Sequence, residues 1–302
     1  MAAEIAAVVG NHQGEFVLRD CLESLKAQTR RPRSLIVVDG ASTDRSADLA
    51  EELGAHVLHA PNRGLGFLYN VGARATDCDY VLFSNNDVAY EPDCLERLAA
   101  ALDADGRRFA ADPTQLGWSD GRVIHARTKL DRGRLWHEYL PGLHIDDAQP
   151  ADCVVPTVSA HGAAMLVRRD FLLELGLFDE TFFMEWEDLD LCWRAWSRGW
   201  PSVYVPEARL RHRVGAVTTL DVRARRSASS HHNLMRFALK CLPASAAVRV
   251  VAGELLRLPR HPRAISCALL QVAREMPDIL VARRQLRPHG ELLEWMLAGQ
   301  PT

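Results

Sequence analysis

The sequence predicts an α/β fold built on a doubly wound, mostly parallel sheet, and three observations support this class. Strand-like apolar runs alternate with amphipathic helical stretches through residues 1–105. Asn11, Asp39 and Asp87 each stand where one of these apolar runs ends. The chain of 302 residues is 48% hydrophobic and 25% charged, an ordinary globular composition that can bury a sizeable core.

The alternation begins at the amino terminus and continues to a fourth strand. Ile5–Gly10 is predicted to be a buried strand, and Glu15–Gln28 an amphipathic helix with Phe16 among its inward residues. The pattern then repeats with a strand at 34–38, a helix through 48–53, a strand at 56–59, a helix ending near 75 and a strand at 80–84. Elements at this spacing predict parallel strands joined by helical crossovers.

The alternation of strands and helices ends after a further predicted helix at 92–105. Short strands are predicted at 122–128, 134–139, 154–158, 163–167, 202–205 and 208–212. Beyond Asp221 the chain is predicted to be helical and basic, with 13 Arg or Lys against 3 acidic residues between Arg223 and Arg287. Four prolines are expected to break this helical region: Pro243, Pro259, Pro262 and Pro277.

Polar residues at the strand ends are expected to line one crevice, because ligands of doubly wound sheets bind beyond the carboxyl ends of the strands. Asp39 either caps its own turn or accepts a hydrogen bond from a nucleotide base or ribose. Asn85-Asn86-Asp87 is either an Asx-rich turn or the source of a carboxylate for a divalent ion that bridges a diphosphate. Both interpretations stay open for each motif.

Composition and missing motifs exclude several classes of protein. The net charge of −3 gives no nucleic-acid signal. Seven cysteines, an odd number without a C-x-x-C pair, indicate free thiols in a reducing cytosol. We expect no signal peptide before the first strand and find no apolar run long enough to cross a bilayer, so a cytoplasmic location is expected. The sequence also lacks a P-loop, a dinucleotide fingerprint and a serine-hydrolase elbow.

The stretch Gly176–Arg194 is the most informative for chemistry. A helix is predicted to begin near Glu187, where acids complement the helix dipole and Asp190 pairs with Arg194. This structural interpretation does not explain the large aromatic residues among the acids, which make carboxylates costly to bury. Carboxylates beside aromatic faces suit a site that holds a sugar and takes a proton from a hydroxyl. The acids of this stretch include Glu185, Glu187, Asp188 and Asp190.

The motifs follow one order along the chain: Val9-Gly-Asn11, Val38–Asp44, Asn62-x-Gly64 with Asn70-x-Gly72, Asn85-Asn86-Asp87, Gly162–Arg169, Gly176–Glu180, Glu187–Arg194 and His212. Each motif is unspecific by itself, and an isolated histidine such as His212 is usually structural. The ordered set resembles the family-2 glycosyltransferases of GT-A fold, particularly their rhamnosyltransferase-like branch. The resemblance covers about residues 5–212, with a looser similarity through residues 230–243.

The resemblance implies inverting transfer of a sugar, L-rhamnose or another hexose, from a dTDP- or UDP-sugar donor to a hydroxyl acceptor. Asp188 would be the general base, with Glu187 as the substitute candidate. Asp87 would hold Mg²⁺ or Mn²⁺, with His212 as a further ligand. The residues implied for the donor are Asn11, Asp39, Asn62, Asn70, Asn85 and Asn86. Those implied for the acceptor or the sugar are His161, Gly162, Glu185 and Trp186.

The sequence departs from the family pattern at three places. Asn85 replaces the first Asp of the DxD motif, which leaves the metal site with one fewer charge. Glu185 stands where an aromatic residue is common, so a polar or cationic acceptor fits. Large residues occupy the third loop, where small ones are usual: Phe67, Leu68 and Tyr69. Two other classes stay open, a catalytically silent nucleotide-sugar-binding protein and a sugar nucleotidyltransferase.

The predicted organisation is a catalytic domain at residues 1–220, with a nucleotide-binding half at 1–105 and an acceptor-binding half at 106–220. A basic helical extension follows at 221–302. Its apolar residues recur at helical spacing and are interspersed with arginines: Val248, Val251, Leu255 and Leu258, then Leu269, Val272, Ala273 and Met276. These helices either pack on the catalytic domain or form a homodimer contact, or they lie on an anionic inner leaflet as a peripheral attachment.

Overall fold

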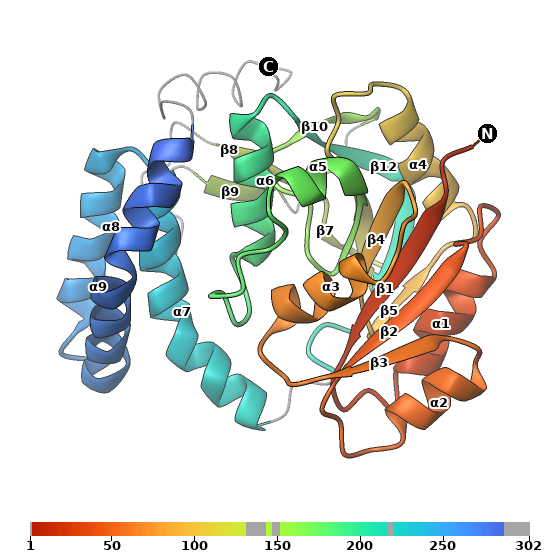
Figure 1. Ribbon diagram of the computed structural model, residues 1–302, viewed down its shortest axis with the longest axis horizontal. Coiled ribbons are helices and arrows are strands. Elements are labelled where there is room, and N and C mark those ends of the chain that lie inside the picture. Colours follow the sequence, from red (N-terminus) through yellow and green to blue (C-terminus); the bar gives the residue numbers. More distant parts are fainter. Residues whose placement is uncertain (1, 131–142, 147–151, 217–219, 287–302) are drawn as a thin grey trace.

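The structure, a computed structural model, describes residues 2–130, 143–146, 152–216 and 220–286. One large mixed sheet forms its centre (Figure 1). Four parallel strands make one half of this sheet: β3 (His56–Ala60), β2 (Ser34–Gly40), β1 (Ile5–Asn11) and β4 (Tyr80–Asn85). The other half continues from β4 with β11 (Ala164–Arg168), β6 (Ala110–Gly117), β12 (Ser202–His212) and β10 (Val155–Thr157). The mostly parallel, helix-covered sheet predicted from the sequence is confirmed.

Shorter strands extend the second half of the sheet. β5 (Val88–Tyr90) pairs with β12, and β7 (Val123–His125) pairs with β6. β8 (Arg127–Leu130) and β9 (Leu143–Asp146) form a separate two-stranded sheet. The strand predicted at Arg134–Tyr139 and the end of the extension at 287–302 lie outside the described residues.

Helices cover both faces of the sheet because the central strands β1 and β4 of the parallel half are buried on both sides. One face packs against α1 (Leu18–Lys26), α2 (Ser46–Glu52) and α4 (Cys94–Asp103). The opposite face packs against α3 (Leu65–Arg74), α5 (Arg169–Glu174) and α6 (Glu187–Ser197). The predicted start of α6 at Glu187 is confirmed.

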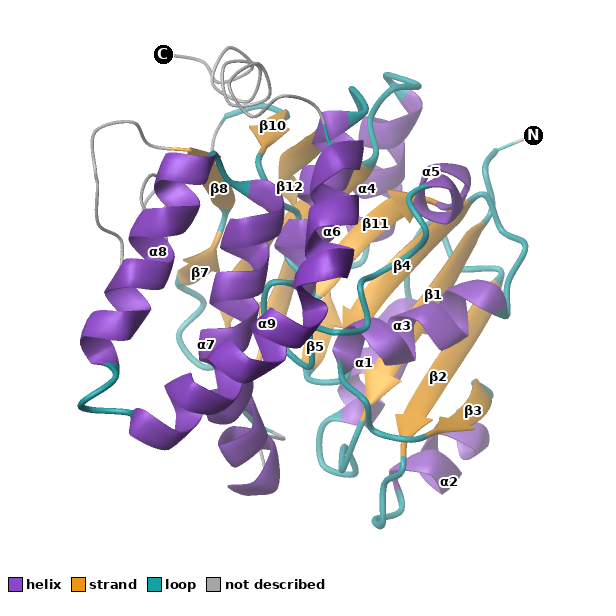
Figure 2. Cartoon of the chain, turned by 60° about the vertical axis from the view of Figure 1, so that its left-hand side comes forward, coloured by secondary structure: helices purple, strands orange, loops and turns teal. Residues whose placement is uncertain are grey.

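Three further helices form a layer beside α6, as Figure 2 shows. They are α7 (Leu220–Cys241), α8 (Ala244–Arg257) and α9 (Pro262–Gln285). Phe237 of α7 packs against Trp193 of α6, with ring centroids 5.6 Å apart in an edge-to-face arrangement. Met235 of α7 packs in turn against Val272 of α9. No helix in the described ranges has both the length and the apolar character to span a bilayer.

Several details differ from the predictions. Phe16 is 89% exposed, because α1 begins only at Leu18 after a turn in which Gly14 O accepts hydrogen bonds from two amides. The strands predicted at 202–205 and 208–212 form the single strand β12, whose pairing with β6 shifts register between Val205 and Arg209. Pro277 lies inside α9 and does not end it. A long helix tolerates the loss of the one backbone hydrogen bond that a proline removes, because packing holds the helix on both sides of the proline.

A buried cluster of charges fixes α7 to the segment before α6. Asp179 Oδ2 lies 2.9 Å from Lys240 Nζ and 2.9 Å from Arg236 Nη2. Lys240 Nζ also lies 2.6 Å from Asp190 Oδ1, and Arg236 Nη1 lies 2.8 Å from Glu275 Oε2 of α9. Burial by itself would raise the pKa of Asp179, but the charges of Lys240 and Arg236 outweigh it and lower the pKa well below its usual range.

We expect Asp179→Asn to lower the free energy of unfolding in urea by about 3–5 kcal/mol at pH 7, because it leaves two buried cations with fewer carboxylates. The folded-state pKa is lowered, so this contribution is complete above the unfolded-state pKa of about 3.9 and is lost as the pH falls below it. The difference between the two proteins should therefore shrink below about pH 4. Glu23→Gln is the control, because Glu23 pairs with Arg19 at the surface and such pairs contribute under about 1 kcal/mol. A difference that does not change with pH would contradict the assignment.

Candidate active site

The carboxyl ends of β1, β2 and β4 join three of the predicted donor residues in one hydrogen-bonded chain. Asn11 stands opposite Asp39 in the register of β1 and β2. Asn86 Nδ2 donates to Asn11 Oδ1 over 2.7 Å, and Asn11 Nδ2 donates to Asp39 Oδ1 over 2.9 Å. All three side chains are buried. The polar strand ends therefore converge, as parallel strands predict.

Asp39 also organises the turn that follows β2. Ser42 N donates to Asp39 Oδ2 over 3.0 Å, and the Ser42 hydroxyl donates to Asp39 Oδ1. Asn62, on the next loop, lies beside this turn, because a Cβ at Gly40 would lie 3.6 Å from Asn62 Cβ. The turn-capping interpretation of Asp39 is confirmed, and contact with a donor nucleotide stays a prediction for both Asp39 and Asn62.

Asn70 uses its amide to hold the segment before α6. Its Nδ2 donates to Phe178 O and to Glu180 Oε1, both over 3.0 Å, and its Oδ1 accepts from Phe178 N over 3.0 Å. The side chain is 1% exposed. These contacts account for Asn70 as a link between α3 and this segment, and the structure does not join it to the chain of Asn11 and Asp39.

Asp87 and His212 meet where β4 ends and β12 ends. Both side chains are buried, and His212 Nε2 lies 3.2 Å from Asp87 Oδ1. His212 Nδ1 lies 2.9 Å from Gln115 Oε1 on β6. With Nδ1 donating to that amide oxygen, the Nε2 lone pair is available to a cation that Asp87 also binds.

The residues present at this point fit a divalent cation. Asp87 Oδ1 is buried and receives no hydrogen bond within the described chain, which leaves its lone pairs for a cation beside His212. A metal-binding imidazole usually donates its other N–H to a neighbouring acceptor, as His212 does to Gln115. Within the described residues no three His, Cys, Asp or Glu side chains form a complete metal site. An ion that bridges a diphosphate needs only one or two protein ligands, because phosphate oxygens and water complete its shell.

Asp188 lies in the first turn of α6, half-buried. Its Oδ2 accepts from Gly162 N over 2.7 Å and its Oδ1 accepts from Leu189 N over 2.7 Å. Burial raises the pKa of Asp188, and the two amide hydrogen bonds oppose this rise. The carboxylate is therefore fixed in place and is a stronger base than an exposed aspartate.

Glu187 differs from Asp188 in its surroundings. It is 4% exposed, and its Cβ faces α3, because a Cβ at Gly66 would lie 3.6 Å from it. Asp188 instead keeps part of its surface exposed next to the turn at Gly162. Of the two candidate bases, Asp188 is the more accessible to an acceptor hydroxyl.

The chain enters α6 through two left-handed residues, Glu185 with φ 69° and Trp186 with φ 75°. Such backbone is strained for residues other than glycine and persists only where neighbours hold it. Asn233 Nδ2 of α7 donates to Met184 O over 2.9 Å and to Glu185 O over 3.2 Å. The Trp186 ring lies 5.4 Å from Phe237 of α7. The extension therefore supports the loop that leads to Asp188, and contact of Glu185 and Trp186 with an acceptor stays a prediction.

The turn at His161 and Gly162 binds two carboxylates from different elements. His161 N donates to Asp112 Oδ1 over 3.1 Å, and Gly162 N donates to Asp188 Oδ2 over 2.7 Å. A Cβ at Gly162 would lie 3.3 Å from Asp188 Oδ2, so the glycine permits this close approach. His125 Nε2 lies 2.9 Å from Asp112 Oδ2 and completes the group.

The His161 ring is held in one neutral form. Its Nδ1 accepts from Ala163 N over 3.0 Å, so the proton of the neutral ring is on Nε2. Burial and the neighbouring His125 and His212 lower the pKa of His161 well below its usual range. The ring can therefore donate one hydrogen bond to a ligand without adding charge to the site.

Four residues of this region were not assigned a site role from the sequence: Tyr69, Asp112, Gln115 and His125. Asp112 and Gln115 belong to β6, a strand that the sequence analysis did not predict. A buried polar residue between apolar neighbours is the signal that could have identified Asp112. Tyr69 was noted only as a large residue where small ones are usual.

A mostly parallel sheet with polar residues at its strand ends, a fixed carboxylate and a carboxylate–imidazole pair is the arrangement of a glycosyltransferase-like GT-A fold. Two solved structures share this fold. The mannosyltransferase PcManGT from Pyrobaculum calidifontis, in complex with GDP-Man and Mn²⁺, aligns over 99% of this chain and 86% of its own, with a TM-score of 0.56 and 17% identity. GalNAc-T7 with UDP, GalNAc and Mn²⁺ aligns over 70% of this chain and 43% of its own, with a TM-score of 0.57 and 17% identity.

The chain belongs to Glycosyl transferase family 2, whose profile matches residues 7–172. It is 30% identical over 226 residues to an N-acetylglucosaminyl-diphospho-decaprenol L-rhamnosyltransferase of Mycobacterium tuberculosis, which covers 66% of this chain and 73% of the relative. It is 29% identical over 201 residues to a pre-mycofactocin glycosyltransferase of the same species, over 63% of this chain and 39% of that relative. The enzyme class and the rhamnosyltransferase-like branch predicted from the sequence are therefore confirmed. These relatives give no support to the silent-binder and nucleotidyltransferase alternatives.

Proposed function

We propose that the protein transfers a sugar, with L-rhamnose as the first candidate, from a dTDP- or UDP-linked donor to a hydroxyl acceptor with inversion. One observation carries this proposal. Gly162 N donates to Asp188, and Gly162 O accepts a 2.7 Å hydrogen bond from Tyr69 Oη, which lies 3.1 Å from Asn85 Oδ1. The Tyr69 side chain therefore connects Gly162, which binds the candidate base Asp188, to Asn85 at the end of β4, two residues before Asp87.

In the proposed reaction Asp188 takes the proton of the acceptor hydroxyl while the hydroxyl oxygen attacks the anomeric carbon. The bond between that carbon and the diphosphate breaks, and the nucleoside diphosphate leaves with the electron pair. Asp87 and His212 would hold Mg²⁺ or Mn²⁺, which offsets the charge of the leaving diphosphate. His161 Nε2 would donate a hydrogen bond to a sugar or acceptor oxygen.

The role of Asp188 predicts the kinetics of two matched variants. Asp188→Asn should lower kcat by about 10²-fold or more, the usual scale for loss of a general base, with little change in the KM of the donor. Glu187→Gln is the matched control and should retain most of the activity. Because burial raises the pKa of Asp188, the acidic limb of the wild-type pH profile should have its midpoint above about 3.9, with activity falling as the pH drops through it. A crippled Glu187→Gln with a near-normal Asp188→Asn would exchange the two roles.

The donor and the metal can be tested together by measuring slow hydrolysis of donor sugars. We expect nucleoside diphosphate release from dTDP-L-rhamnose or a UDP-sugar with Mn²⁺, and loss of this release with EDTA. Asp87→Ala should abolish metal-dependent donor binding, measured by calorimetry. Asp20→Asn is the control, because Asp20 pairs with Arg213 next to His212 but lies on the exposed side of α1. Full activity of Asp87→Ala in EDTA would refute the metal assignment, and no release from any donor would refute the function.

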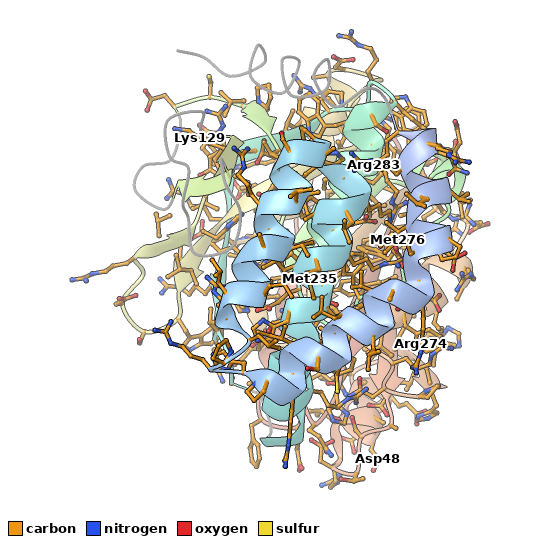
Figure 3. All side chains as sticks on the ribbon, turned by 90° about the vertical axis from the view of Figure 1, so that its left-hand side faces the viewer. Asp48, Lys129, Met235, Arg274, Met276 and Arg283 are labelled. Atoms are coloured by element: carbon orange, nitrogen blue, oxygen red, sulfur yellow. The ribbon has the colours of Figure 1, made fainter. Side chains whose placement is uncertain are left out.

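We propose that the acceptor is a lipid-linked glycan and that the extension lies on the anionic membrane surface that presents it. The mycobacterial rhamnosyltransferase is named for a decaprenol-linked acceptor. In this chain, Val248 and Leu256 on α8 and Leu270 on α9 are 66%, 83% and 60% exposed. Exposed arginines lie on the same two helices and in the turn between them: Arg249, Arg260, Arg263, Arg274 and Arg284. Figure 3 views these helices from the side away from the sheet, with Arg274 labelled. The division into a catalytic domain at 1–220 and an extension at 221–302 stays a prediction.

An anionic surface attracts such a face by roughly 1 kcal/mol for each Arg near the lipid, and salt screens this attraction. We therefore expect the protein to sediment with anionic liposomes at low salt and to be released at high salt. The double variant Arg263→Glu with Arg274→Glu should bind more weakly, whereas Arg45→Glu, at the residue before α2, should not change binding. Absence from the pellet at low salt, or equal binding to neutral liposomes, would refute the membrane proposal and leave homodimer contact as the use of this face.

A further inference from the structure

Tyr69 is enclosed in the core next to the turn at Gly162 that binds Asp188. Its side chain is fully buried, and its ring centroid lies 4.8 Å from that of Phe83 and 5.6 Å from that of Phe178. Gly10 of β1 leaves space for the ring, because a Cβ at Gly10 would lie 3.3 Å from Tyr69 Cε1. The ring therefore cannot move aside, and its hydroxyl has one position.

The Tyr69 hydroxyl faces two possible partners and has one proton to give. Burial raises the pKa of Tyr69 well above its ordinary value, so the phenol keeps that proton at neutral pH. Gly162 O lies 2.7 Å from Tyr69 Oη, and Asn85 Oδ1 lies 3.1 Å from it. A backbone carbonyl can only accept, so the proton is directed to Gly162.

Asn85 must then donate to the tyrosine. Rotation of the Asn85 amide about its last bond puts Nδ2 in the place that Oδ1 has beside Tyr69, and the hydrogen-bond network decides between the two orientations. With the Tyr69 proton on Gly162, the remaining lone pairs of Tyr69 Oη call for a donor, which the Asn85 nitrogen supplies. An aspartate at position 85 could not do this, because an ionised carboxylate only accepts.

We propose that Tyr69 and Asn85 act as a pair of positioning residues for Asp188. Asn85 donates to Tyr69, which keeps the tyrosine proton on Gly162 O and so holds the residue whose own N–H binds Asp188. This inference rests on the proposed role of Asp188 as the base. It also gives a reason for asparagine at the first DxD position. Asn85 would help to position Asp188 through Tyr69, and would not be the remnant of a metal-binding aspartate.

The alternative explanation makes the opposite prediction for one substitution. If Asn85 were only a missing carboxylate of the metal site, Asn85→Asp would strengthen metal binding and raise activity. If Asn85 supports Tyr69, the new carboxylate draws the tyrosine proton away from Gly162 and frees the turn that holds Asp188. The aspartate and asparagine side chains have the same shape, so this variant tests the hydrogen bond and not the packing.

The experiment compares Tyr69→Phe, Asn85→Asp and the double variant. Each single change should lower kcat by about tenfold to a hundredfold, the scale of a misplaced catalytic group, with the donor KM within about twofold. The double variant should be no slower than Tyr69→Phe alone, because both changes release the same carbonyl. Tyr90→Phe is the matched control: its buried hydroxyl donates to Ser84 of β4, the residue before Asn85, over 2.8 Å and not to Gly162, so kcat should stay unchanged.

Hydrogen exchange at the Gly162 amide in the ligand-free protein gives a readout that does not depend on activity. Exchange should accelerate by about tenfold in Tyr69→Phe and in Asn85→Asp, because the amide loses its fixed acceptor, and should not change in Tyr90→Phe. Equal or higher activity of Asn85→Asp, multiplicative losses in the double variant, or unchanged Gly162 exchange would each overturn the inference. If the wild type transferred no sugar, the proposed function would fail, and the exchange rates would still decide whether the pair holds the turn.

Discussion

The peptide between His161 and Gly162 is the joint on which the arrangement of the site depends. The amide of His161 binds Asp112 of β6, the amide of Gly162 binds Asp188 of α6, and the carbonyl of Gly162 accepts from Tyr69 of α3. Three elements that are distant in sequence are thus fixed by one turn at the start of β11. Every group in the contact is buried or half-buried, so water competes weakly for these bonds and each is worth more than at the surface.

The three C-terminal helices impose a second constraint, from outside the sheet. Asn233 holds the left-handed entry to α6, and Arg283 of α9 donates to the carbonyls of Leu239 and Leu242 near the end of α7. α9 therefore braces α7, which in turn braces the loop that leads to Asp188. The helices that the sequence marks as a basic extension belong to the support of the site.

The parallel half of the sheet could be predicted because its pattern is local. Apolar runs such as Ile5–Asn11 are buried on both faces, and polar residues at their ends must meet at one edge. β6 could not be predicted in this way, since Asp112 and Pro113 interrupt its apolar pattern, and buried partners satisfy Asp112 only in the folded chain. The contact between Tyr69 and Gly162 joins residues 93 positions apart, and the left-handed backbone at Glu185 is imposed by α7. Sequence periodicity carries no information on either.

The buried charges between Asp179 and α7 bear on how such a protein can change during evolution. Lys240 and Arg236 neutralise a carboxylate that lies in the preceding segment, so neither side is stable in its present form without the other. A recombination event between Asp179 and α7 would separate the carboxylate from its cations unless the incoming helices carried equivalents. Exchange of the helical layer alone would therefore leave buried charges without their partners and lower the stability of the product.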